Sequence, residues 1–116
     1  MIQWTFEQST SSLNIDCTFV STDDDEIMKL ADNCSVKTII RPNNLCKDDS
    51  TSESALKHAI ECLKHDHHIS PDIIVFLQAT SPLRLYNDID NAINLFKKDK
   101  ADSLFSSTRL SDLTLW

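Results

Sequence analysis

The stretch DIIVFLQATSPLR, residues 72–84, has the most informative pattern in this chain of 116 residues. Its first half, 72–77, is a nearly continuous apolar run, which is typical of a strand buried on both faces of a parallel sheet. Its second half, 78–84, is a polar loop around a Ser-Pro step. Ligands bind outside the carboxyl ends of strands in open parallel sheets, so the loop is a candidate binding segment. The same residues also fit a structured turn with a surface arginine.

The segments on either side extend this pattern. Residues 17–21 and 36–40 also predict strands, and 101–107 predicts a last one. Apolar residues at helical spacing predict helices over the ranges 2–12, 27–34, 55–63 and 89–96. Ser50 and Glu53 have the spacing of a capping box before the third of these helices. Helices and strands thus alternate, which predicts an α/β fold with a doubly wound, Rossmann-like, mostly parallel sheet covered by helices on both faces.

Composition and charge limit the classes of function. The net charge of −7 argues against a nucleic-acid partner, because such proteins need a basic face. No apolar run approaches the roughly 20 residues of a membrane helix, and no signal peptide is recognised, so no membrane partner and a cytoplasmic location are expected. The chain contains no glycine, so it has no glycine-rich phosphate loop. The four cysteines lack C-x-x-C spacing and are interpreted as reduced thiols.

Three polar segments directly follow predicted strands: residues 21–23, 41–42 and 78–84. The amide of Gln78 offers both donors and an acceptor, which suits sugar hydroxyls or a base edge. The guanidinium of Arg84 suits a carboxylate or phosphate. Arg41 is a candidate for a nucleotide, or alternatively for an ion pair with the nearby carboxylates of residues 48 and 49.

Two further clusters have a metal-like composition. The acidic run 23–26 is interpreted as the start of a helix, where carboxylates pair with unpaired N–H groups and the helix dipole. The run HDHH at 65–68 is interpreted as a solvated loop, because no second cluster of ligands accompanies it. No Ser/His/Asp or Cys/His set indicates a nucleophile, so we assign no catalytic and no metal-binding residue.

Five motifs in order carry a resemblance to a known family: VSTDDDEI at 20–27, IIRPNNL at 39–45, DDSTSESALKHAI at 48–60, IIVFLQATSPLR at 73–84 and DIDNAI at 88–93. Together they resemble the acylneuraminate cytidylyltransferase (CMP-sialic acid synthetase) family. The resemblance implies a fold of the nucleotide-diphospho-sugar transferase type. It also implies a nucleotidyltransferase that uses Mg²⁺ to transfer CMP from CTP to an acidic nine-carbon sugar, releasing pyrophosphate.

The resemblance also implies site residues. Arg41, Ser50 and Ser52 would bind the nucleotide, and the sugar would contact residues of the 78–84 loop, namely Gln78, Thr80, Ser81 and Arg84. The family's first strand and glycine-rich loop would precede residue 1, and its metal ligands and dimerisation region would follow residue 116. We therefore expect a single partial domain over 1–116 that is incomplete at both ends and inactive alone. The full-length family is expected to form homodimers.

Alternatives remain at this point. A related enzyme for another acidic sugar, such as legionaminate, fits the same motifs, whereas octulosonate cytidylyltransferases carry a Gly-Asp motif where this chain has Ala79 and Thr80. A non-catalytic α/β binding module of the receiver type fits the acidic cluster. That fold expects an aspartate at the end of the central strand, where this chain has Gln78. A gene fragment without function is the third alternative.

Overall fold

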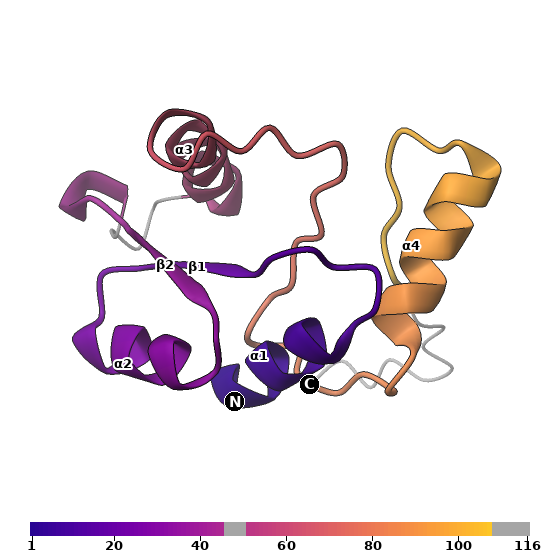
Figure 1. Cartoon of the computed structure of the whole chain (residues 1–116), viewed down its shortest axis with the longest axis horizontal. Helices are drawn as coiled ribbons and strands as arrows, with labels where there is room; N and C mark the ends of the chain where they lie inside the picture. Colours follow the sequence, from indigo (N-terminus) through magenta and orange to yellow (C-terminus); the bar gives the residue numbers. More distant parts are fainter. Residues whose placement is uncertain (46–50, 108–116) are drawn as a thin grey trace, which may run out of the picture.

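The computed structural model describes residues 1–45 and 51–107 of the chain. Its elements, in order, are α1 (Ile2–Ser11), β1 (Phe19–Thr22), α2 (Asp25–Asn33), β2 (Lys37–Ile40), the 3-10 helix η1 (Asn43–Leu45), α3 (Ser52–His65) and α4 (Asp88–Asp99). In Figure 1, α1 and α2 lie below the sheet formed by β1 and β2, and α3 lies above it. The predicted α/β class is confirmed, with a parallel sheet of two strands in the described residues.

The unit β1–α2–β2 is a parallel pair of strands joined by a helix. Residues 19–22 pair in register with residues 37–40. The connecting helix begins where the acidic run places it, because the carboxylate of Asp24 accepts hydrogen bonds from the backbone N–H groups of Glu26 and Ile27 at 2.7 and 3.2 Å. This cap satisfies two N–H groups that have no partner within the helix. The interpretation of residues 23–26 as a helix start is confirmed.

The main core joins α1 to this unit. Phe6 is 3% exposed and packs with the buried side chains of Ala31 and Val36. Partly buried apolar side chains surround them, namely Ile2, Val20, Ile27, Leu30 and Cys34. The hydroxyl of Ser9, which is also buried, donates to the carbonyl of Phe6 at 2.9 Å, so burial leaves it satisfied. α1 is therefore a fixed part of the core and not a loosely attached end.

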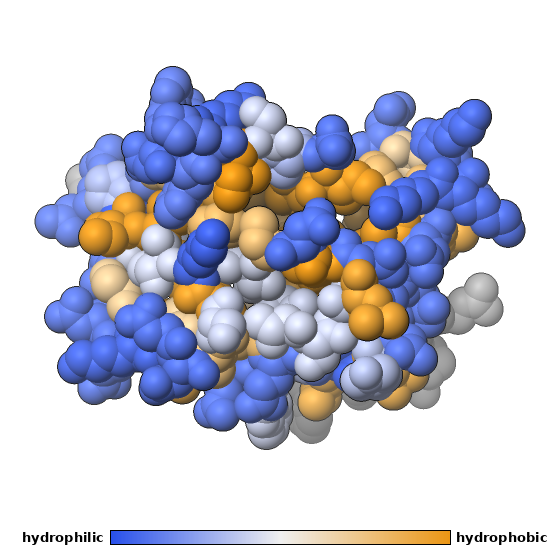
Figure 2. Space-filling model, viewed as in Figure 1, coloured by the Kyte–Doolittle hydropathy of each residue, from blue (hydrophilic) through white to orange (hydrophobic). Residues whose placement is uncertain are grey.

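The strands predicted at 72–77 and 101–107 are not formed in the described structure. Residues 66–87 make an irregular connection from α3 to α4, and Ile74, Val75 and Phe76 are 44%, 38% and 54% exposed. A strand needs hydrogen-bonded neighbours, and the sheet of the described residues has only the two strands β1 and β2. Figure 2 shows apolar side chains gathered on the visible face between α3 and α4. The doubly wound sheet therefore stays a prediction.

The capping box predicted at Ser50 and Glu53 is wrong by one residue. Ser50 lies outside the described residues, and α3 has Thr51 as its N-cap, whose hydroxyl accepts from the backbone N–H of Ser54 at 3.2 Å. Glu53 is then one position too early to reach back to the cap. Its carboxylate instead pairs with Lys57 at 2.9 Å, one turn along the helix.

Among the described residues, three have left-handed backbone conformations, namely Ser35, His68 and Lys100, with φ of 58°, 54° and 49°. Such positions favour glycine, because a side chain there crowds the backbone. The chain contains no glycine, so other residues must take these conformations. Lys100 ends α4, whose buried face consists of Ile89 and Ile93.

Candidate functional site

The first part of the candidate site lies at the carboxyl ends of β1 and β2. Arg41, directly after β2, donates from Nε to the hydroxyl of Ser21 at 3.2 Å and from Nη2 to the carbonyl of the same residue. Its backbone N–H continues the ladder to the carbonyl of Thr22 at 2.9 Å. The polar segments at the ends of these two strands are therefore brought together. The alternative carboxylate partners of Arg41, residues 48 and 49, lie outside the described residues.

Ser52, predicted at the nucleotide, is the first residue of α3, and its side chain is exposed. The first turn of a helix presents N–H groups without internal partners, so this position suits an anionic ligand. Ser50, its predicted companion, lies outside the described residues. Their roles at a nucleotide stay predictions.

The second part is the 78–84 loop, which is closed on itself by Arg84. Nη2 of Arg84 donates to the carbonyl of Gln78 at 3.2 Å, and the backbone N–H of Ser81 donates to the same carbonyl at 3.2 Å. Within the described residues, the side chains of Gln78, Thr80 and Ser81 make no hydrogen bond, and all three residues are exposed. The loop therefore presents one amide and two hydroxyl groups around a fixed guanidinium.

The helix α1 holds this loop through Gln8, a residue that the sequence did not single out. The side-chain amide of Gln8 donates to the carbonyl of Pro82 at 2.9 Å and accepts from Nη1 of Arg84 at 3.0 Å. Arg84 is thus held by two neutral acceptors, and no carboxylate of the described residues forms an ion pair with it. Its positive charge remains available to an acidic ligand.

A second polar contact, at Asp90, fixes the end of α1 against the start of α4. The carboxylate of Asp90 accepts from the hydroxyl of Ser12 at 2.6 Å, from the backbone N–H groups of Leu13 and Asn14 at 3.2 and 3.0 Å, and from the side-chain amide of Asn14 at 3.0 Å. The hydrogen bond from Ser12, and then those from Leu13 and Asn14, hold the pKa of Asp90 below its ordinary value. The carboxylate is therefore stabilised in its charged form.

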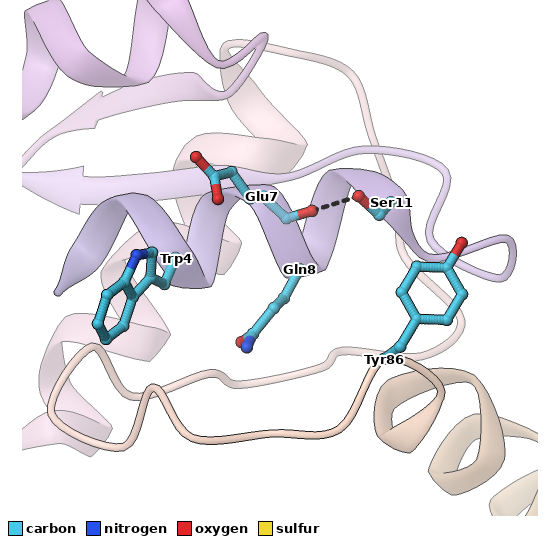
Figure 3. Close-up of a pocket in the computed structure, with 5 residues that line it drawn as sticks. All are labelled: Trp4, Glu7, Gln8, Ser11 and Tyr86. Carbon is cyan, nitrogen blue, oxygen red and sulfur yellow. Dashed lines mark hydrogen bonds between the residues drawn. The ribbon is translucent and has the colours of Figure 1, made fainter.

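An open hollow of about 280 Å³ lies on the outer side of α1 and is shown in Figure 3. It is lined by Trp4, Glu7, Gln8, Ser11 and Tyr86. None of these residues was predicted for the site. Gln8 lines the hollow and points toward the loop that crosses below α1 in this view, while Trp4 and Tyr86 stand at its two ends. The hollow therefore adjoins the Arg84 contact but is not the predicted sugar pocket itself.

The described contacts divide the predicted residues into two groups on different elements. Arg41 is held by Ser21 on β1, whereas Arg84 is held by Gln8 on α1. The sequence missed Gln8 and the role of Asp90, because partners 74 to 78 residues away leave no trace in local spacing. Asp90 does lie in the DIDNAI motif, and this was the only feature of the sequence that could have drawn attention to it.

Comparison with known proteins adds the deciding observation. The profile of the cytidylyltransferase family matches residues 1–113. The chain belongs to the cytidylyltransferase family. Among its relatives is the pseudaminic acid cytidylyltransferase of Campylobacter jejuni subsp. jejuni serotype O:23/36 (strain 81-176), which is 31% identical over 109 residues. The N-acylneuraminate cytidylyltransferase A of Danio rerio is 29% identical over 109 residues, and the N-acylneuraminate cytidylyltransferase of Oncorhynchus mykiss is 28% identical over 111 residues.

The matches cover 93% or 94% of this chain but a smaller share of its relatives. The chain spans 47% of the Campylobacter protein and 24% of each fish protein. The predicted resemblance is therefore confirmed at the level of the family. The family match also argues against the alternative of a receiver-type binding module.

In the described residues, neither the acidic run 23–26 nor the HDHH run 65–68 is part of a cluster that could hold a metal ion. In residues 1–45 and 51–107, no group of three His, Cys, Asp or Glu side chains is placed to hold a metal ion. The ring of His67 instead packs edge-on against Phe19 of β1, with ring centroids 5.2 Å apart. Mg²⁺, whose ligands the resemblance places after residue 116, therefore stays a prediction. Over the same ranges, no helix is long and apolar enough to cross a membrane.

Proposed function

We propose that this chain is the part of a cytidylyltransferase that binds CTP at the carboxyl ends of β1 and β2 and an acidic nine-carbon sugar at the 78–84 loop. The complete reaction would transfer CMP from CTP to the sugar and release pyrophosphate. The observation that supports the sugar assignment is Arg84, which neutral acceptors hold and whose charge no described carboxylate cancels. The names of the relatives, which refer to pseudaminic acid and N-acylneuraminate, agree with an acidic substrate.

The nucleotide assignment depends on Arg41. Its guanidinium is oriented by Ser21 at the edge of the sheet where parallel strands present ligands. A guanidinium held in this way can attract a phosphate without a large loss of side-chain freedom. Ser50 and Ser52 complete the nucleotide proposal at the start of α3. Catalysis would then depend mainly on placing the two anionic substrates together, with Mg²⁺ as a further expected participant.

Calorimetry on the 116-residue chain tests both assignments. We expect CTP binding that Arg41→Gln weakens about tenfold, as for the loss of a charge-assisted hydrogen bond, while Arg84→Gln leaves it unchanged. We expect the reverse for N-acetylneuraminate and pseudaminic acid. Lys29→Gln is the matched control, because Lys29 is an exposed cation of α2. A chain that is folded but binds neither CTP nor an acidic sugar would overturn the proposal.

The identity of the sugar is a separate question within this proposal. Pseudaminic acid is favoured as the first substrate to test, because the relative with that name shows 31% identity. Legionaminate and N-acetylneuraminate are the comparison substrates. Dissociation constants for the three sugars, measured under the same conditions, rank them directly.

We also propose that residues 1–116 alone do not catalyse the transfer of CMP to the sugar. The chain matches 47% of the length of the Campylobacter relative. In the described residues, no group of three or more His, Cys, Asp or Glu side chains is placed to hold a metal ion. Release of pyrophosphate from CTP and an acidic sugar is the appropriate assay. Turnover by the purified chain would contradict this part of the proposal while supporting the assignment of substrates.

A further inference from the structure

Gln8 connects α1 to the 78–84 loop, because its side-chain amide donates one hydrogen bond to the loop and accepts another from it. Its Nε2 donates to the carbonyl of Pro82, and its Oε1 accepts from Arg84, at 2.9 and 3.0 Å. The backbone N–H of Arg84 donates to the same Pro82 carbonyl at 3.1 Å. One side chain therefore contacts both the backbone of the loop and its charged group.

The helix that carries Gln8 provides a rigid base. Phe6 and Ser9, which lie within a turn of Gln8, are 3% and 1% exposed. The packing of Phe6 against Ala31 and Val36 ties α1 to the β1–α2–β2 unit. A hydrogen bond from Gln8 thus places Arg84 relative to the core, whereas the bond from Arg84 to Gln78 only fixes the loop relative to itself.

The chemistry of this contact requires an amide. A carboxylate at position 8 would accept from Arg84 but would lose the donor to Pro82, and it would neutralise the guanidinium. An apolar side chain would lose both hydrogen bonds. Glutamine fixes the arginine and leaves its charge uncancelled, which is the state that an acidic ligand needs.

We infer that Gln8 is a positioning residue for the acidic sugar, acting through Arg84 and the Pro82 carbonyl. This inference rests on the proposed function, in which Arg84 receives the carboxylate of the sugar. Gln8 itself touches the loop and not the reacting atoms. Its effect is therefore expected on the affinity for the sugar and not on the affinity for CTP, whose proposed site lies on β1 and β2.

The test compares Gln8→Leu, Gln8→Glu and the control Gln3→Leu in the 116-residue chain. Gln3 is an exposed glutamine of the same helix, and its amide donates only to Glu7 among the described residues, at 3.0 Å. Two readouts are needed: the NMR signal of the Nε–H group of Arg84 without ligand, and the calorimetric dissociation constants for N-acetylneuraminate, pseudaminic acid and CTP. If Gln8→Leu does not fold, Gln8→Asn replaces it, because the shorter amide cannot make both bonds.

We expect Gln8→Leu to shift or broaden the Arg84 signal and to weaken binding of the sugar about tenfold, with CTP binding unchanged. We expect Gln8→Glu to keep the Arg84 signal ordered while weakening sugar binding at least as much, because the new carboxylate competes with the ligand. Gln3→Leu should change neither readout. This pattern would separate the effect of the position of Arg84 on sugar binding from the effect of its charge.

Two results would overturn the inference while leaving the proposed function intact. An Arg84 signal that is unchanged in Gln8→Leu would show that Gln8 does not place the guanidinium. A changed signal with wild-type affinity for the sugar would show that the placement does not serve this ligand. If the unaltered chain binds CTP but no acidic sugar, the sugar part of the proposed function fails, and the inference about the sugar falls with it, while the Arg84 signal still decides whether the contact exists.

Discussion

The N-terminal region, residues 1–40, and the connection between α3 and α4, residues 66–87, place their apolar side chains in opposite ways. Of the six buried apolar side chains in the described residues, four belong to the first region, namely Phe6, Ala31, Val36 and Ile39. The connection contains the longest apolar run, yet Ile74, Val75 and Phe76 are exposed. The difference teaches that burial is decided by the partners a segment has and not by its own composition.

The largest expected effect on stability comes from replacing a phenylalanine by alanine, and the same replacement can be made in both regions. Phe6→Ala should lower the free energy of unfolding by about 3–5 kcal/mol, because it removes a fully buried ring from a packed core. Phe76→Ala should lower it by less than about 1 kcal/mol, because the ring is 54% exposed. Urea unfolding followed by circular dichroism measures both values.

Equal losses for the two variants would break the comparison. They would mean that Phe76 is packed in solution and that residues 72–77 form part of a larger sheet. Such a result would support the doubly wound fold that the sequence predicts.

The fold was predictable where the signal is local. The strands near 17–21 and 36–40, and the helix that begins at the acidic run, follow from β-branched residues, helical spacing and capping groups. The strand at 72–77 was predicted on equally good local grounds and is absent, because a strand also requires neighbours that a local pattern cannot supply. The start of α3 was misplaced by one residue, because Ser50 and Thr51 are both good N-cap residues.

A medium effect is expected from the contact of Asp90 with residues 12–14, which joins α4 to the N-terminal region. The hydrogen bond from Ser12 holds the pKa of Asp90 below its ordinary value of 3.8, so the charged form favours the folded state. That stabilisation is complete above pH 3.8 and is lost as the pH falls through the lowered pKa. Asp90→Asn should therefore lower the midpoint of thermal unfolding at neutral pH.

The pH dependence sharpens this prediction. The difference in melting temperature between the wild type and Asp90→Asn should shrink as the pH falls below 3.8. Asp16→Asn is the control, because Asp16 is exposed and makes no hydrogen bond among the described residues. A difference that stays constant with pH would mean that the charge of Asp90 contributes nothing to the contact.

The candidate residues can be named from the sequence, and their binding roles stay predictions, whereas the contacts that hold them cannot be named from it. Polar groups after a strand indicated Arg41, and composition together with the family resemblance indicated Gln78 and Arg84. The sequence could not show that Arg41 is oriented by Ser21 or that Arg84 is held by Gln8, because these contacts arise from the packing of distant segments. Local patterns identify groups that can bind a ligand, whereas tertiary contacts decide how those groups are held.

The smallest effect concerns Lys100, which ends α4 in a left-handed conformation with φ of 49° and ψ of 41°. Lys100→Gly should raise the free energy of unfolding by roughly 0.5–1 kcal/mol, because glycine adopts this conformation without crowding. Lys98→Gly, within the last turn of the same helix, should instead lower it by about 1 kcal/mol. A loss of stability in both variants, measured by urea unfolding, would contradict the assigned end of α4.

The most direct test of the central claim is an NMR titration of the 116-residue chain, with backbone amide signals followed as CTP or an acidic sugar is added. We expect the two ligands to bind on different elements. CTP should perturb the signals of Ser21, Thr22 and Arg41, while N-acetylneuraminate or pseudaminic acid should perturb those of residues 78–84 and Gln8. Perturbations of the same residues by both ligands, or no perturbation at either place, would contradict the account.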